Sequence, residues 1–266
     1  MRSNQQSRHG RRPRAEILAS LARGLVVSAQ THRNGGPLDD PDTLVRIALA
    51  AELGGAAAFR VASADVVGLL RARTALPIIG ITKNLTVGDA VYITPTVADA
   101  LALVDAGADI VAAHAAREGR PAETFEEIVR ACHARGVAVL ADCATLDEAA
   151  DAVRAGADAV ATTMAGYTEG TRHVVPPALD LASQLAHELP VPVIVEGGVW
   201  DRDAVAAAFA AGAHAVVVGS AVTDPERITR RLVEAIPAGA GTDPVPVGRA
   251  DAVAPSPASS GTFTQS

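Results

Sequence analysis

Short apolar runs rich in β-branched residues alternate along the chain with longer amphipathic stretches. Runs of this kind are typical of strands that are buried on both faces of a parallel sheet. Eight are present, at 24–30, 56–61, 77–83, 109–114, 137–143, 158–163, 191–197 and 215–220. The stretches between them repeat apolar residues with the helical period, most clearly at 43–53, 97–106, 124–134, 146–155 and 203–211. The alternation predicts right-handed βαβ units and a parallel sheet.

An internal repeat indicates how this sheet closes. In each copy a helix ends, a glycine caps it, and a strand begins about two residues later. The copies are LGGAAAFR (53–60), AGADIVAA (106–113), AGADAVAT (155–162) and AGAHAVVV (211–218). They introduce every second strand, so the chain divides into four similar quarters. This regularity favours a closed (β/α)₈ barrel over an open sheet, whose strand order must reverse, and no glycine-rich dinucleotide fingerprint follows the first strand.

The two ends of the chain differ from the periodic middle. Residues 1–13 are basic, polar and aperiodic, which predicts a disordered arm. Residues 237–266 are dominated by Pro, Gly, Ala, Ser and Thr, which predicts a second disordered tail. The expected folded unit is therefore 14–236, a length close to the smallest (β/α)₈ barrels.

Composition narrows the classes of partner and compartment. Aromatic residues are only 3% of the chain while apolar residues are 49%, so Ala, Val, Ile and Leu must fill the core. A net charge of −7 argues against nucleic acid as the main partner. No apolar run is long enough to cross a bilayer, and the N-terminus lacks a signal-peptide core. Cys132 and Cys143 form no metal-binding pattern, so we expect a cytoplasmic protein in a reducing compartment.

The residues at the predicted strand exits are far more polar than the strands that precede them. In a (β/α)₈ barrel this end carries the active site. The exit residues are Gln30, Arg60, Lys83, His114, Asp142, Thr162 with Thr163, Glu196, and Gly219 with Ser220. Gln30 or His114 alone is equally consistent with the start of a loop. Four charged groups converging on one rim require another explanation, because burying charge is costly unless the groups pair or bind a ligand.

Lysine usage singles out one of these charged groups. Lys83 is the only lysine, beside 22 arginines. Arginine stays protonated in proteins, whereas a buried lysine can lose its proton and act as a base. Lys83 is therefore the candidate general base.

Glycines follow the last two predicted strands, in EGG (196–198) and GSA (219–221). Such turns expose backbone N–H groups, and a short helix can follow at TDPERI (223–228). This arrangement is the recurring phosphate site of phosphate-binding barrels, although two ordinary tight turns would look alike. His114, Asp142 and Glu196 lack the spacing of a metal site, so we expect neither a metal nor a redox cofactor.

Over about 24–236 the chain resembles the N-acetylmannosamine-6-phosphate 2-epimerases. The matching stretches include GLVVSAQ, LPIIGITK, YITPT, VLADCAT, ATTMAGYT, VPVIVEG and GAHAVVVGSAVTDP, and their order and spacing also match. YITPT after the third strand and GYT after the sixth are specific to this family rather than to phosphate barrels in general.

The resemblance implies a function and a role for each site residue. Members interconvert N-acetylmannosamine 6-phosphate and N-acetylglucosamine 6-phosphate at carbon 2, in sialic acid and amino sugar breakdown. It makes Lys83 and Glu196 the catalytic pair. The implied substrate-binding residues are Gln30, Arg60, Asp142, Thr163 and Tyr167, and the implied phosphate-binding residues are Gly197, Gly198, Gly219 and Ser220. The implied partner is a small amino sugar phosphate, with no cofactor, nucleic acid or membrane, and barrels of this kind often form homodimers.

Three positions depart from the family pattern. His114 stands where members commonly have the aspartate of LDAT, Gly198 replaces an arginine after the seventh strand, and Asp224 replaces an arginine after the eighth. Two potential phosphate-side cations are thereby lost. Arg202 or Arg227 would be placed to compensate.

Two other readings stay open at this stage. Another phosphate barrel, such as a pentose-phosphate epimerase or a thiamin-phosphate-type synthase, has the same fold. A metal-dependent pentose-phosphate epimerase would need His and Asp ligands near strands two and three, where this chain has Arg60 and Lys83. The three departures also allow a sugar-phosphate-binding protein without catalysis, which the retention of Lys83 and Glu196 opposes.

Overall fold

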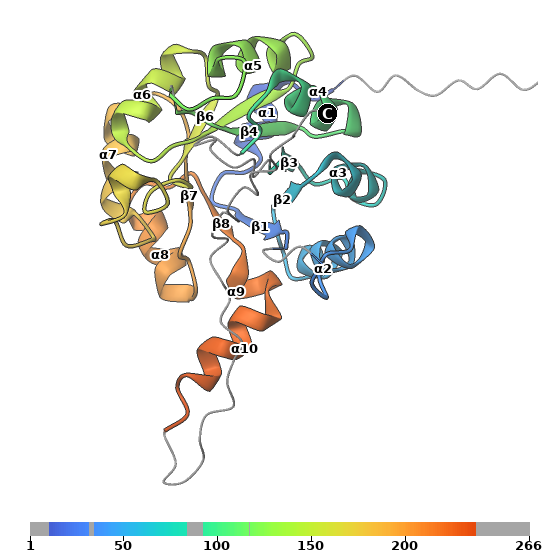
Figure 1. Ribbon diagram of the computed structural model, residues 1–266, viewed down its shortest axis with the longest axis vertical. Helices are drawn as coiled ribbons and strands as arrows, with labels where there is room; N and C mark the ends of the chain where they lie inside the picture. The colour runs from blue at the N-terminus through green and yellow to red at the C-terminus, as the bar shows by residue number, and fades with distance from the viewer. Residues whose placement is uncertain (1–10, 32–34, 84–92, 117, 238–266) are drawn as a thin grey trace, which may run out of the picture.

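The computed structural model describes residues 11–31, 35–83, 93–116 and 118–237. Eight parallel strands close into a barrel in sequence order, with β8 paired to β1 (Figure 1). The strands are β1 Leu25–Ala29, β2 Ala58–Ala62, β3 Ile78–Ile81, β4 Ile110–His114, β5 Ala138–Asp142, β6 Ala159–Ala161, β7 Val193–Glu196 and β8 Ala215–Val218. The predicted (β/α)₈ barrel and all eight predicted strands are confirmed.

Helices surround the barrel and connect its strands (Figure 1). They are α1 Arg14–Ala19, α2 Pro41–Leu53, α3 Ala64–Arg71, α4 Val97–Ala106, α5 Phe125–His133, α6 Leu146–Arg154, α7 Leu179–Glu188, α8 Arg202–Ala210, α9 Ser220–Thr223 and α10 Pro225–Val233, with a 3₁₀ turn at Glu169–Thr171. The five helices that were predicted most clearly, α2, α4, α5, α6 and α8, each begin and end within two residues of the predicted positions. The short helix expected at 223–228 is instead two helices, because Asp224 separates α9 from α10.

Local sequence explains where these helices begin and end. In α5 the Thr124 hydroxyl accepts a hydrogen bond from the Glu127 N–H (3.2 Å), and the Glu127 carboxylate accepts one from the Thr124 N–H (2.8 Å). This capping box satisfies two N–H groups at the helix start. The repeated glycine after a helix has the expected left-handed conformation, with φ of +106° at Gly107 after α4. A residue with a Cβ would be strained there.

Two layers of apolar side chains fill the fold. Alternate strand residues point outward against the helices or inward to the barrel axis. The inward layer includes Val26, Ala58, Ile79, Ile110, Ala138, Ala159, Ile194 and Ala215, one from each strand. Ile17 and Leu18 of α1, with Leu21, belong to the same cluster. Helix α1 therefore closes the N-terminal end of the barrel, and the opposite end is left for the site.

The predicted arm and tail fall largely outside the described residues, which begin at residue 11 and end at residue 237. Within the predicted arm, the Arg11 guanidinium donates hydrogen bonds to the carbonyl oxygens of Val104 and Ala108, both at 2.7 Å. In the described part of the chain, no helix is both long and apolar enough to span a bilayer.

Candidate active site

The alternation of the strands carries the predicted polar residues to one end of the barrel. Each lies two or four positions after an inward residue of its own strand, so each faces the axis as well. These residues are Gln30 after β1, Arg60 in β2, Lys83 after β3, His114 ending β4, Asp142 ending β5, Thr163 after β6, Glu196 ending β7 and Gly219 after β8. The C-terminal mouth of the barrel is thus a ring of functional side chains above an apolar interior.

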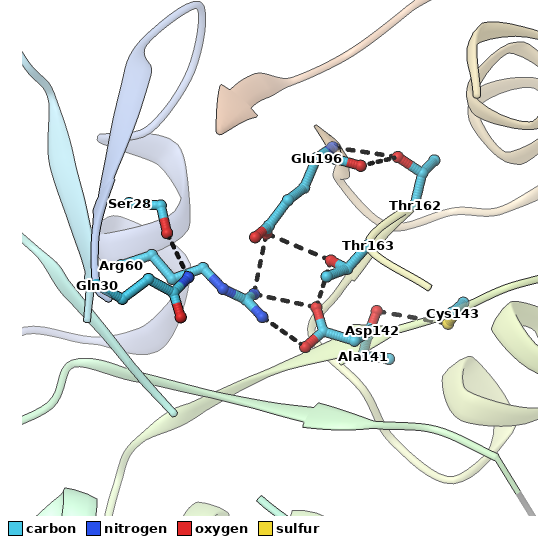
Figure 2. Close-up of polar contacts among 9 residues, drawn as sticks. All are labelled: Ser28, Gln30, Arg60, Ala141, Asp142, Cys143, Thr162, Thr163 and Glu196. Atoms are coloured by element: carbon cyan, nitrogen blue, oxygen red, sulfur yellow. Dashed lines mark hydrogen bonds and ion pairs between the residues drawn. The ribbon is translucent and has the colours of Figure 1, made fainter. Parts of the chain in front are cut away.

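Arg60 is the centre of this ring (Figure 2). Its guanidinium donates to both carboxylate oxygens of Asp142, from Nη1 at 3.0 Å and from Nη2 at 2.7 Å. Nη1 also lies 3.1 Å from Oε2 of Glu196. Arg60 is 1% exposed and Asp142 is fully buried, and bidentate pairing of this kind is what makes buried charges tolerable.

Two adjacent threonines position the carboxylates. The Thr163 hydroxyl lies 2.6 Å from Oδ1 of Asp142 and 3.3 Å from Oε2 of Glu196, so its one proton can be donated to either. The Thr162 hydroxyl accepts from the Glu196 N–H and donates to the Glu196 carbonyl, both at 3.1 Å. Thr162 is one of the predicted exit residues, but no role was predicted for it. Because adjacent strand residues point to opposite sides, Thr162 points away from the axis that Thr163 faces, and its hydroxyl binds backbone atoms of Glu196.

Glu196 titrates far from an ordinary glutamate. Burial raises the pKa of Glu196 to about 7, and the charge of Asp142 acts in the same direction. Arg60, the Thr163 hydrogen bond and Lys83 oppose that rise. A carboxyl group with this pKa can give or take a proton near neutral pH.

The pKa of Lys83 is shifted in the opposite direction, downward. Lys83 lies on the rim of the barrel, where the residue is exposed to solvent. Desolvation by the surrounding protein, followed by the positive charge of Arg60, lowers the pKa of Lys83 to about 8, against the pull of Glu196. The lysine and the carboxyl group therefore titrate close to one another.

Ile93 and Thr94 lie beside the end of β3. Lys83 forms an isolated antiparallel bridge with Ile93. The Thr94 N–H donates to the Thr82 carbonyl at 3.0 Å, and the Thr94 hydroxyl accepts from the Thr82 N–H at 3.1 Å. This returning segment holds the end of YITPT against the β3 exit and so helps to fix the position of Lys83. Tyr92 of that motif lies outside the described residues.

Gln30 is hydrogen bonded to Ser28, a residue that was not among the predicted site residues. Its amide Nε2 donates to the Ser28 hydroxyl at 2.6 Å (Figure 2). Ser28 is buried and lies two positions before Gln30, so the strand alternation alone could have identified it. The Thr223 hydroxyl of α9 donates to the Ser28 carbonyl at 2.9 Å, which ties the β8 exit to β1.

The glycine turn after β7 is shaped by the segment after β6. A β-carbon on Gly198 would lie 2.5 Å from the Pro176 carbonyl carbon, and φ is +69° there. A β-carbon on Gly197 would lie 3.7 Å from the Tyr167 ring. Tyr167 is 60% exposed and so borders the mouth on the β7 side rather than joining the Arg60 network. With Pro176 at this distance, Gly198 leaves no space for a larger side chain.

The β8 side of the mouth consists of Gly219, Ser220 and the start of α10. Ser220 begins α9, and Asp224 caps α10 by accepting from the Arg227 N–H at 3.1 Å. The positive charge of Arg227 contributes to lowering the pKa of Lys83. The Nε atom of Arg227 also lies 3.5 Å from Oδ2 of Asp224. Arg202 is an exposed residue in the first turn of α8.

His114 is present in the ring but takes no part in its hydrogen bonds. Its side chain is 1% exposed, and neither ring nitrogen has a hydrogen-bond partner in the described part of the chain. Burial lowers the pKa of His114, with Asp142 opposing and Arg120 adding to the decrease. Among the described residues, no three or more His, Cys, Asp or Glu side chains are grouped to hold a metal ion.

Fold and site together define a (β/α)₈-barrel protein with a charged network and two closely titrating groups at its C-terminal mouth. The chain belongs to the N-acetylmannosamine-6-phosphate epimerase family. The family model, described as "Putative N-acetylmannosamine-6-phosphate epimerase", matches residues 44–238. The resemblance noted in the sequence is therefore confirmed.

Relatives and solved structures agree with this membership. A "Putative N-acetylmannosamine-6-phosphate 2-epimerase" of Thermosynechococcus vestitus is 41% identical over 84% of this chain and 97% of its own. The relative of that name in Caldanaerobacter subterraneus subsp. tengcongensis is 37% identical over 82% and 93%. The N-acetylmannosamine-6-phosphate 2-epimerase structure from Clostridium perfringens superposes with a TM-score of 0.80 at 32% identity, covering 88% of this chain and 100% of that one. A thiamine phosphate pyrophosphorylase from Pyrococcus furiosus, at 19% identity and a TM-score of 0.54, shares the fold alone.

Proposed function

We propose that this protein is an isomerase that interconverts N-acetylmannosamine 6-phosphate and N-acetylglucosamine 6-phosphate by inverting carbon 2. The observation that carries the proposal is the barrel mouth, where Arg60 lies 3.1 Å from Glu196 at the end of β7 and Lys83 follows β3. The pKa values of Lys83 and Glu196 are displaced toward each other, to about 8 and about 7. In the open-chain sugar, carbon 2 lies beside an aldehyde, so its proton is acidic once the carbonyl is polarised. Inversion then needs one group that removes a proton and another that returns one.

The residues divide this work as follows. The pair reacts with one proton shared between its two groups. With that proton on Glu196, Lys83 takes the carbon-2 proton onto Nζ, which leaves an enediolate, and Glu196 supplies a proton to the opposite face. Because the pKa of Lys83 is the higher of the two, this is the minor one of the two singly protonated forms. In the reverse direction the two groups exchange roles. Arg60 stabilises the negative charge that develops on the oxygen. Asp142 already accepts two hydrogen bonds from Arg60, so it orients the guanidinium as well as offering remaining lone pairs to a sugar hydroxyl.

The phosphate is placed at the glycine turns after β7 and β8. Backbone N–H groups around Gly197, Gly198, Gly219 and Ser220 would bind it, in the manner of phosphate-binding barrels. Arg227, in the first turn of α10 just after the β8 exit, would supply a cation on the same side.

A pair of alanine variants separates Arg227 from Arg202. We expect Arg227→Ala to raise KM for the sugar phosphate about fivefold, because an exposed ion pair is worth about 1 kcal/mol or less. Arg202→Ala is the matched control and should leave KM unchanged. Equal affinities in both variants and the wild type would remove Arg227 from the phosphate site.

One experiment tests the reaction itself. The protein is incubated with N-acetylmannosamine 6-phosphate in deuterium oxide, and carbon-2 exchange and product are followed by NMR. N-acetylglucosamine 6-phosphate carrying deuterium at carbon 2 is the expected result. If neither product nor exchange appears while the sugar phosphate still binds, the protein is a non-catalytic sugar-phosphate-binding protein and the proposed reaction is wrong.

The proposal extends to the pathway in which the protein acts and to its oligomeric state. The reaction would serve amino sugar and sialic acid breakdown in the cytoplasm. The protein would act as a homodimer, and α10 supports this, because none of its residues is buried and it projects from the barrel (Figure 1). Leu232 and Val233 of α10, with Ile236 beyond it, are 67%, 49% and 68% exposed, an apolar surface of the kind that marks an interface.

A further inference from the structure

His114 is fixed at the level of the catalytic groups. It ends β4, where Ile110 and Ala112 face the barrel interior, so by alternation its side chain also faces the axis. Its backbone N–H donates to the Ile93 carbonyl at 3.1 Å, and its carbonyl accepts from Nη1 of Arg120 at 2.6 Å. The neighbouring strand pairs it with Asp142. The imidazole is therefore a rigidly placed member of the ring.

The imidazole differs from the rest of the ring because both of its polar atoms are unsatisfied, whereas Gln30 lacks a partner only at Oε1 and donates from Nε2 to Ser28. A neutral imidazole offers one N–H donor and one acceptor nitrogen. Both nitrogens of His114 are enclosed without a hydrogen-bond partner in the described part of the chain. Arg60, Asp142, Thr163 and Glu196 are by contrast bonded to one another. An enclosed unsatisfied group is unfavourable, and in functional sites such a group commonly awaits a ligand or a water molecule.

The order of the strands indicates which part of a substrate reaches His114. A phosphate at the β7 and β8 turns, with carbon 2 between Lys83 on the β3 side and Glu196 on β7, directs the far end of the molecule toward β4. That end carries the acylamino group on carbon 2. An amide has a carbonyl acceptor and an N–H donor and no charge, which matches a neutral imidazole.

We propose that His114 determines specificity by hydrogen bonding to the acylamino group of the sugar. This inference rests on the proposed function and names a recognition residue for the same site. It also accounts for a polar side chain kept at a buried position where an apolar residue would fit without unsatisfied atoms. The proposal makes no demand on His114 as an acid or a base.

Two variants test it against a packing role. His114→Leu removes both polar atoms, and His114→Gln keeps one donor and one acceptor. We expect His114→Leu to raise KM for N-acetylmannosamine 6-phosphate at least tenfold with a smaller change in kcat, while its melting temperature is equal to or above that of the wild type. His114→Gln should recover part of that loss. A second substrate, mannosamine 6-phosphate, lacks the acyl group and should respond little to either change.

The outcomes are distinct. An unchanged KM in His114→Leu with a raised melting temperature would show that the imidazole only fills space. Equal losses in both variants for both substrates would also overturn the proposal. If the wild-type protein lacks turnover, the proposed function fails first. Calorimetric binding of N-acetylmannosamine 6-phosphate to the wild type and to both variants then still decides whether His114 contacts the ligand.

Discussion

At the scale of single residues, Arg60 links the two groups that exchange protons. Its guanidinium opposes the rise in the pKa of Glu196 and adds to the decrease in the pKa of Lys83. Asp142 accepts two hydrogen bonds from it, and the Thr163 hydroxyl in turn donates to Asp142. The acid–base properties of the pair thus depend on a buried network that is bonded to Glu196 and whose charge acts on Lys83. Each member of the pair can be tested separately.

Replacing Lys83 tests the base. We expect Lys83→Ala to lose roughly 10²–10⁴-fold in kcat, the usual contribution of a positioned acid–base group, while sugar phosphate binding persists. Lys83→Arg is the matched control, because arginine keeps the positive charge but does not release its proton. It should be equally inactive. Near-normal turnover in either variant, measured by the coupled formation of N-acetylglucosamine 6-phosphate, would remove Lys83 from the mechanism.

The pH dependence tests the pair together. Below about pH 7 both Glu196 and Lys83 are protonated, so no base is available; above about pH 8 both are deprotonated, so no acid is available. We therefore expect kcat to follow a bell-shaped curve with its maximum between these values. In the Glu196→Gln variant, the pH profile of the residual kcat should lack the change near pH 7. A wild-type profile that is flat from pH 6 to 9 would contradict this assignment.

At the scale of elements, the segment after β6 and the turn after β7 fit only because residue 198 is a glycine. We expect Gly198→Ala to lower the free energy of unfolding by about 1–3 kcal/mol, since its β-carbon meets Pro176 in a strained backbone conformation. Gly170→Ala is the control, because nothing lies within 4 Å of its β-carbon position. Urea unfolding midpoints measure both. Equal midpoints for the two variants would mean that Pro176 moves aside freely.

The same elements show what the sequence could predict. The strands followed from the apolar, β-branched runs, and the exit residues followed because the C-terminal ends of the strands of a (β/α)₈ barrel carry its site. The glycine caps followed from the left-handed conformation that Gly107 and its equivalents adopt. The contact of Gly198 with Pro176 and the closure of the barrel by α1 could not be predicted, since both depend on how distant segments pack. Thr162 was missed as a positioning residue because its partners are backbone atoms of another strand.

At the scale of the whole molecule, α10 has too little support within its own chain. It has nine residues and none is buried, and isolated helices shorter than about 12–15 residues are marginal in water. Arg231 lies over the Trp200 ring at 5.0 Å, but the apolar residues at the end of the helix remain exposed. A second copy of the chain that covers these residues would explain both the exposure and the stability of the helix.

Charge introduced at this surface tests the assembly. We expect the wild-type protein to sediment as a dimer, and Leu232→Asp with Ile236→Asp to sediment as a monomer, because a carboxylate would be buried without a partner in the interface. Leu53→Asp is the matched control, since Leu53 is 92% exposed and ends a different helix, α2. It should leave the dimer intact. A monomeric wild type, or a double variant that still dimerises, would place the contact elsewhere. Dissociation of the double variant with retained turnover would show that the site at the barrel mouth is complete within one chain.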